Sequence, residues 1–294
     1  MKNDHQEFYP SALAVGGSDS GGGDGIQADL RTFNAAGVFG CSVITSVAAQ
    51  NPHGTVMQEA VSPQLVKAQY EAVTSAIAVR VIKTGVLANA EIIAALCQAL
   101  NKKSVPLITA PTMFTEAGAP LLNKKALQAM KEDFLLLADM ILLNLPEAEY
   151  LLDSKLSSEA DHLAAAEALA QRYQSNILLQ TSAVSSTGKL TAAAVLEKKT
   201  FLLSAPRVAD LSEFASHGYT GTFASAAAAM LAVGNSWRDA VKFALAYVCG
   251  SLNESAPIGK DIDAMYPPLE DYTPQVTMRS AGNQPRQNKG KSHA

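Results

Sequence analysis

Short apolar runs alternate with stretches of helical periodicity through the first half of the chain. The first run, Leu13–Val15, is followed by Ile26, Leu30 and Phe33 at helical spacing. Between the run and the helix lies a turn dense in glycine, residues 16–25. This pattern predicts a buried strand, a turn in which backbone can approach a small molecule closely, and a helix.

The same alternation continues to about residue 143. Apolar runs predict strands over 41–50, 81–85, 105–109 and 140–143, and periodic stretches predict helices over 62–79, 88–100 and 123–137. Strands that alternate with helices across short connections form a parallel sheet covered by helices on both faces. The fold class predicted from the pattern is therefore α/β, with a mainly parallel central sheet.

The pattern changes near residue 176. Three short runs over 177–180, 191–196 and 200–203, separated by turns at 185–188 and 197–199, predict an antiparallel meander at the C-terminal side of the sheet. A second glycine turn, 217–222, then opens a helix over 223–233, and a further helix follows over 237–253.

One domain over residues 11–271 accounts for this pattern, because no long linker interrupts it. Residues 1–10 are expected to be a flexible N-terminus, and the polar residues 272–294 are expected to be a disordered tail. Neither a signal peptide nor a membrane-length apolar run is present, which predicts a cytoplasmic protein without a membrane partner.

Charge and cysteine usage narrow the classes of ligand. The net charge is -4 and only 17% of residues are charged, so a nucleic-acid partner is not expected. Cys41, Cys97 and Cys249 are far apart in apolar surroundings, and the histidines lack metal-ligand spacing. These cysteines are therefore interpreted as core thiols, and a transition-metal site is not expected.

Candidate chemistry lies where strands end, because ligands of open α/β sheets bind at the carboxyl ends of strands. The residues that follow predicted strands are Gly17, Ser18 and Asp29; Gln50; Lys83–Val86; Ala110–Met113; Asn144 and Glu147; Gln180; and His217–Thr222. Asn144 and Glu147 suit either water-bound Mg²⁺ with its phosphates or a helix capping box. The second glycine turn suits a phosphate, since it opens a helix.

Several motifs together resemble hydroxymethylpyrimidine/phosphomethylpyrimidine kinases, a family of the ribokinase-like superfamily that serves thiamine biosynthesis. The matching stretches, which extend the likeness over residues 11–265, are Gly16–Gly23, Gly25–Leu30, Gly40–Thr45, Ala49–Asn51, Lys83–Gly85, Leu87–Ala88, Gly118–Leu122 and Asn144–Glu149. The resemblance implies a ribokinase-like three-layer fold and transfer of the ATP γ-phosphate to 4-amino-5-hydroxymethyl-2-methylpyrimidine or its monophosphate. A homodimer is also plausible for this superfamily.

The resemblance also implies roles for particular residues. Asp29 would accept the exocyclic amine of the pyrimidine, and Gln50 would pair with the amine or a ring nitrogen. The implied substrate pocket comprises Gly17, Asp29, Ala48, Gln50, Val86 and Thr112, of which Val86 and Thr112 replace the family's usual Met and Val. ATP and Mg²⁺ would be held by Asn144, Glu147, Gln180 and Thr222, with Glu147 acting on Mg²⁺ indirectly, and Gly218, Thr220 and Gly221 would form the catalytic turn.

The likeness fails at the catalytic turn. The family's turn reads His-Gly-Thr-Gly-Cys-Thr, or has Asp in place of Cys, so Gly221 stands where the catalytic base is expected and cannot accept a proton. Inserting Tyr219 in the alignment does not restore a base. Ala110 replaces an Asp, and residues 180–183 and 211–214, which include Glu213, differ from segments that serve the nucleotide.

Three functions therefore remain open. The first is the pyrimidine kinase itself, with weakened activity. The second is a non-catalytic pyrimidine-binding pseudokinase that acts as a sensor or partner protein. The third is a pyridoxal kinase, which shares the fold, although the Asp29 motif and Gln50 favour an aminopyrimidine.

Overall fold

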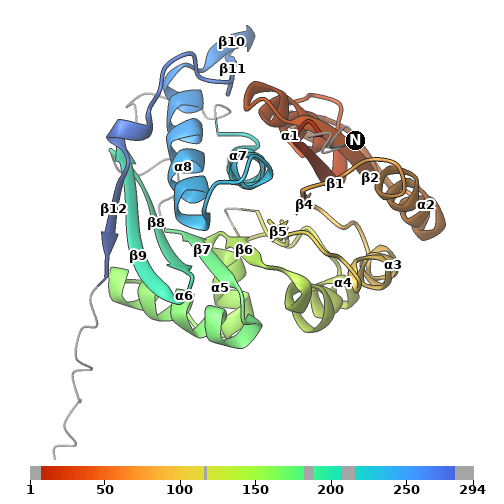
Figure 1. Ribbon diagram of the computed structural model, residues 1–294, viewed down its shortest axis with the longest axis horizontal. Coiled ribbons are helices and arrows are strands. Elements are labelled where there is room, and N and C mark those ends of the chain that lie inside the picture. The colour runs from red at the N-terminus through yellow and green to blue at the C-terminus, as the bar shows by residue number, and fades with distance from the viewer. Residues whose placement is uncertain (1–7, 116–117, 182–187, 207–215, 282–294) are drawn as a thin grey trace, which may run out of the picture.

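A computed structural model describes residues 8–115, 118–181, 188–206 and 216–281. Within these ranges, ten strands form one sheet in the order β12-β9-β8-β7-β6-β5-β4-β1-β2-β3 (Figure 1). Their bounds are β1 Ser11–Asp19, β2 Phe39–Asn51, β3 Gly54–Ala60, β4 Val81–Thr84, β5 Leu107–Thr109, β6 Met140–Leu143, β7 Asn176–Gln180, β8 Lys189–Leu196, β9 Lys199–Pro206 and β12 Thr277–Ser280.

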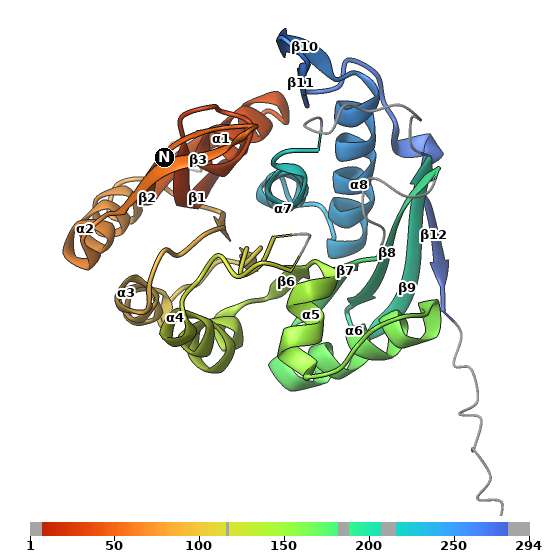
Figure 2. The same cartoon turned by 180° about the vertical axis from the view of Figure 1, so that it is seen from behind.

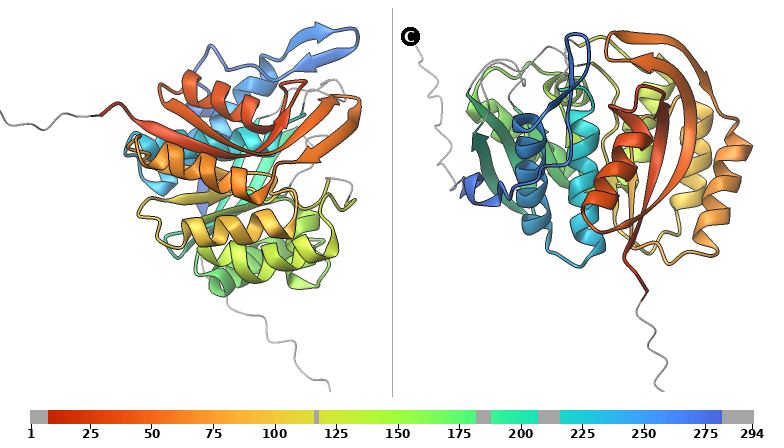
Figure 3. Two further views of the ribbon diagram at one scale, coloured as in Figure 1. Left: turned by 90° about the vertical axis from the view of Figure 1, so that its right-hand side faces the viewer. Right: turned by 90° about the horizontal axis from the view of Figure 1, so that it is seen from above.

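The helices cover both faces of this sheet (Figures 1 and 2). Their bounds are α1 Gly25–Ala35, α2 Pro63–Thr74, α3 Ala90–Leu100, α4 Lys124–Ala129, α5 Leu145–Leu152, α6 Glu159–Tyr173, α7 Tyr219–Ala232 and α8 Trp237–Asn253. A π-helical segment, Met130–Phe134, and a 3₁₀ turn, Leu135–Leu137, prolong α4. A separate hairpin, β10 Ala256–Gly259 and β11 Ile262–Ala264, stands apart from the sheet (Figure 3).

The middle of the sheet is parallel. β2, β1, β4, β5, β6 and β7 run in one direction, so their carboxyl ends meet at one edge. β3 pairs antiparallel with β2, and β8, β9 and β12 extend the other side as an antiparallel set. The predicted parallel sheet and its meander are confirmed.

Alternation along the strands divides the interior into two cores. Ala12 and Ala14 of β1 face the core formed with α1, α7 and α8, whereas Leu13 and Val15 face the core formed with α2 to α6. All four are fully buried. The first core is rich in alanine, because α7 buries Ala224 and the run 226–229. These small side chains let α7 approach the sheet closely.

Polar caps start most of the helices. Ser62, Asn89, Asn123, Ser158 and Ser236 each accept a hydrogen bond from a backbone N–H of the first turn. These caps satisfy N–H groups that lack a partner inside the helix.

The structure differs from the predicted elements in several places. β3 was not predicted, because all its residues are exposed and carry no alternating apolar pattern. The polar tail expected from residue 272 contains β12, which pairs with residues 201–204 of β9. α7 begins at Tyr219, four residues before the expected start. The turn expected at 185–188 lies mainly outside the described residues.

None of the helices in the described part of the chain is long and apolar enough to span a bilayer. The cysteines there are free thiols, with Cys41 and Cys249 buried and Cys97 half-buried.

Candidate functional site

Two cavities lie side by side at the carboxyl edge of the parallel strands. The first, here called the glycine-loop pocket, has a volume of about 320 Å³ and is lined by residues of the glycine turn, β2, β3 and β4. The second, the α7 pocket, has a volume of about 400 Å³ and lies at the N-terminus of α7. The residues that line both are Asp24, Pro52, Thr112, Leu121, His217 and Gly221.

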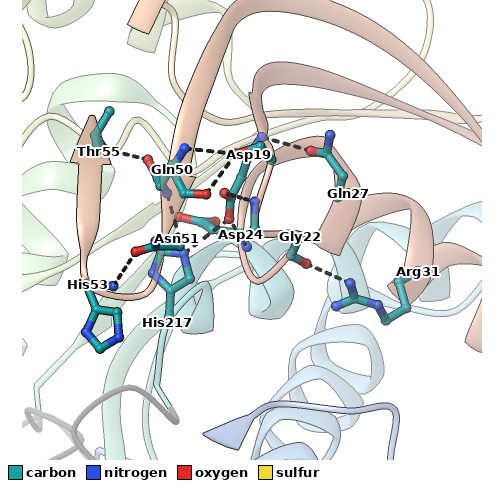
Figure 4. Close-up of polar contacts among 12 residues, drawn as sticks. Asp19, Gly22, Asp24, Gln27, Arg31, Gln50, Asn51, His53, Thr55 and His217 are labelled. Atoms are coloured by element: carbon teal, nitrogen blue, oxygen red, sulfur yellow. Dashed lines mark hydrogen bonds and ion pairs between the residues drawn. The ribbon is translucent and has the colours of Figure 1, made fainter. Parts of the chain in front are cut away.

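Asp19 holds the glycine turn in shape. Its carboxylate accepts the backbone N–H groups of Gly21 at 2.8 Å and Asp24 at 2.9 Å, and its Oδ2 lies 3.2 Å from His217 Nε2 (Figure 4). The side chain of Gln27 accepts from the Asp19 N–H at 2.9 Å. Asp19 therefore links the two glycine turns, a role that the sequence analysis missed.

Asp29 is fully buried beneath the glycine-loop pocket. Lys83 Nζ donates to both of its carboxylate oxygens, at 2.7 and 2.8 Å, and Ser225 Oγ donates to Oδ1 at 2.6 Å. Burial raises the pKa of Asp29, and the Lys83 ammonium opposes this rise. The Oδ2 atom accepts from Lys83 alone among the described residues, so it retains acceptor capacity, and Asp29 lines the pocket.

The other residues of the predicted substrate pocket also line this cavity. Gly17, Ala48, Gln50, Val86 and Thr112 contribute to its wall. Gln50 Oε1 accepts from Thr55 Oγ1 at 2.6 Å, and Gln50 Nε2 lies 3.4 Å from His217 Nε2. Thr112 adopts a left-handed backbone conformation, with φ of 49°. The structure thus brings together all six residues predicted for the substrate pocket, Asp29 included.

Asn144 and Glu147 form a capping box at the start of α5. Asn144 Oδ1 accepts the Glu147 N–H, and Glu147 Oε2 accepts the Asn144 N–H, both at 2.9 Å. Glu147 Oε1 accepts the Met113 N–H at 2.8 Å. Burial raises the pKa of Glu147 to about 7, although the backbone hydrogen bonds act to lower it. Of the two alternatives left open by the sequence, the structure contains the capping box, and its two residues also line the α7 pocket.

The second glycine turn places backbone donors at the α7 pocket. Gly218 is the N-cap with φ of 81°, and a Cβ there would collide with the carbonyl oxygen of Gly23. The Thr222 N–H bonds the Gly218 carbonyl. The backbone N–H groups of Thr220 and Gly221 have no backbone acceptor within the described residues, as is usual in a first helical turn. These N–H groups and the helix dipole form a site that fits phosphate oxygens.

Gln180 and Thr222 lie beside the pockets and do not line either of them. Gln180 Oε1 accepts from Thr220 Oγ1 at 2.9 Å, and the buried Gln180 Nε2 has no partner in the described part of the chain. Residues 182–183 and 211–214, including Glu213, lie outside the described residues. No cluster of three or more His, Cys, Asp or Glu that could hold a metal occurs in the described ranges.

The matching family model and the curated relatives agree with each other. A family model described as phosphomethylpyrimidine kinase matches residues 19–265. A hydroxymethylpyrimidine/phosphomethylpyrimidine kinase of Haemophilus influenzae is 36% identical over 252 residues, which are 84% of this chain and 93% of that protein.

Two solved structures extend the comparison. The phosphomethylpyrimidine kinase of Clostridium difficile 630 is 29% identical with a TM-score of 0.71, covering 81% of this chain and 97% of that one. An ADP complex of Bacillus subtilis pyridoxal kinase is 26% identical with a TM-score of 0.79, covering 88% and 97%.

Proposed function

Because the chain belongs to the phosphomethylpyrimidine kinase family, we propose that it transfers the γ-phosphate of ATP to the hydroxymethyl group of 4-amino-5-hydroxymethyl-2-methylpyrimidine or of its monophosphate. The reaction would serve thiamine biosynthesis in the cytoplasm. The observation that carries the proposal is the contact between the two pockets: a small polar cavity opens beside a helix N-terminus that fits phosphate.

The glycine-loop pocket would bind the pyrimidine. Asp29 Oδ2 would accept the exocyclic amine, since Oδ1 already accepts from both Lys83 and Ser225, whereas Oδ2 accepts from Lys83 alone among the described residues. Gln50 offers an amide that can both donate and accept, which suits a ring nitrogen beside an amine. The glycines at 16 and 17 leave the pocket wall as bare backbone, so a flat ring can lie close to it.

The α7 pocket would bind the phosphates of ATP. Thr220 and Gly221 line this pocket at the N-terminus of α7, where the helix dipole is positive. Phosphoryl transfer depends mainly on such positioning and charge stabilisation. Mg²⁺, when bound with ATP, would neutralise phosphate charge. Both oxygens of Glu147 already accept backbone N–H groups, so Glu147 would reach the ion through water.

Calorimetric titration with the hydroxymethylpyrimidine, followed by addition of ATP and Mg²⁺ and mass detection of product, tests this function. Pyrimidine binding and a phosphorylated product are expected. Pyrimidine binding without product would instead establish a non-catalytic pyrimidine-binding protein, the alternative that Gly221 favours.

Pyridoxal kinase is the second candidate, and the likeness to the Bacillus subtilis enzyme favours it. The same assay with pyridoxal in place of the pyrimidine separates the two. Asp29 and Gln50 recognise an amine beside a ring nitrogen, so we expect kcat/KM for the pyrimidine to exceed that for pyridoxal. The reverse order would reject the pyrimidine as the main substrate.

A further inference from the structure

Gly221 carries no side chain at the boundary between the two pockets, and a carboxylate from another element lies next to it. A Cβ built on Gly221 would lie 3.0 Å from Asp24 Oδ1. The same point lies 3.7 Å from Lys83 Nζ and 3.9 Å from Asp29 Oδ1. The carboxylate of Asp24 therefore lies in close contact with the point where a side chain at position 221 would begin.

Asp24 lies at the start of α1, and its side chain does not cap the helix. It is the N-cap residue by backbone geometry, yet within the described residues its side chain makes no capping hydrogen bond. Its backbone N–H is bound by Asp19 at 2.9 Å, which fixes the residue in place (Figure 4). A carboxylate that is half-buried, positioned by its backbone and without a side-chain hydrogen bond to any described residue can interact with a ligand.

The reacting atoms must meet where Asp24 lies. The glycine-loop pocket and the α7 pocket share six wall residues, and Asp24 and Gly221 are two of them. A hydroxymethyl group carried by a ring in the first pocket and a phosphate at α7 in the second can approach each other only across this shared wall. A base for the hydroxyl proton has to be within hydrogen-bond reach of that boundary.

His217 is the other titratable group on the shared wall apart from Asp24, within the described residues. Its Nε2 atom already lies 3.2 Å from Asp19 Oδ2 and 3.4 Å from Gln50 Nε2. These contacts orient the ring as a link between the two glycine turns. Asp29 lies deeper and is bound by Lys83, so Asp24 is the carboxylate best placed for proton transfer.

We propose that Asp24 is the catalytic base of this chain and replaces the side chain missing at Gly221; this inference rests on the proposed kinase function. Asp24 takes the proton of the substrate hydroxyl as its oxygen forms a bond to the γ-phosphorus. The bond between the γ-phosphorus and the β,γ-bridging oxygen breaks, and that oxygen leaves with ADP. Asp24 then releases its proton to solvent.

Steady-state kinetics of four variants test the assignment. Asp24→Asn should lower kcat by about 10²- to 10⁴-fold while the affinity for the pyrimidine, measured by calorimetry, is unchanged. The acid limb of the kcat–pH profile, which reports protonation of the base, should disappear. Asp24→Ala with Gly221→Cys should recover a large part of the lost rate, because it moves a proton acceptor to the adjoining position.

Asp133→Asn is the matched control, since this exposed carboxylate lies in the segment that leads into the amino end of β6, on the edge of the sheet opposite the site. It should keep wild-type kinetics. Circular dichroism establishes that each variant is folded.

The possible outcomes separate the two proposals. If Asp24→Asn turns over as fast as the wild-type protein, the role of Asp24 is overturned and the kinase function stands. Loss of the acid limb in His217→Asn with its retention in Asp24→Asn would assign the base to His217. No product from wild-type protein with the alcohol, its monophosphate or pyridoxal would overturn the kinase function, and the role of Asp24 with it.

Discussion

Replacing Lys83 by Met should destabilise the fold strongly, because it leaves the Asp29 carboxylate buried without a counter-ion. The two side chains are 3% and 1% exposed, so solvent cannot compensate for the lost ammonium. Removing one partner of such a pair typically costs about 3–5 kcal/mol. Ser225 remains as a neutral donor to Asp29, which places the expected loss of unfolding free energy at about 3 kcal/mol.

Urea unfolding followed by circular dichroism measures this loss. The double variant Lys83→Met with Asp29→Asn carries no charge at this buried pair, so it should lose much less than the sum of the two single variants. The pH dependence gives a second check. Without Lys83 the pKa of Asp29 rises further above its unfolded value, so the folded state binds more protons and stability falls as pH increases. Additive losses in the double variant, or a deficit in Lys83→Met that grows on acidification, would refute the reasoning.

Three other changes probe the same region. Glu147→Gln should flatten the pH dependence of the urea midpoint. The pKa of Glu147 is about 7 in the folded state against 4.5 for the unfolded carboxyl, so the wild-type protein loses about 3 kcal/mol of unfolding free energy as pH rises across that interval. An unchanged slope in the variant would contradict this. Gly218→Ala should lower Tm and weaken binding of an ATP analogue, because its Cβ meets the Gly23 carbonyl; wild-type values would exclude strain there. Asp29→Ala should abolish pyrimidine binding in calorimetry; retained affinity would place the ligand elsewhere.

The sequence predicted the parallel part of the fold well, because its strands are continuous apolar runs buried on both faces. Leu13–Val15 and residues 140–143 are of this kind. It did not predict β3 or β12, which lie at the two edges of the sheet and carry mostly exposed residues. Their pairing is set by neighbouring backbone, for which a hydrophobic pattern gives no signal.

The sequence indicated which residues share a cavity better than it indicated the hydrogen bonds that they make. Strand ends and the family resemblance together located Asp29, Gln50 and Thr112 on one pocket. The partnership of Asp29 with Lys83 joins residues 54 positions apart, and no local spacing encodes it. The contact of Asp24 with the space at Gly221 joins two glycine turns in the same way, so it could be found only from the folded chain.

The alanines of α7 have a consequence for catalysis as well as for packing. Protein interiors are close-packed, so the volume of these side chains sets how far the helix axis lies from the sheet. The helix carries Gly221 and the N–H groups proposed to bind phosphate, whereas the sheet carries most of the proposed pyrimidine pocket. The alanine methyl groups in the core thus fix the distance between the phosphate bound at α7 and the pyrimidine bound at the sheet. A larger side chain at residue 227, which lines neither pocket, would change the distance between the reacting groups.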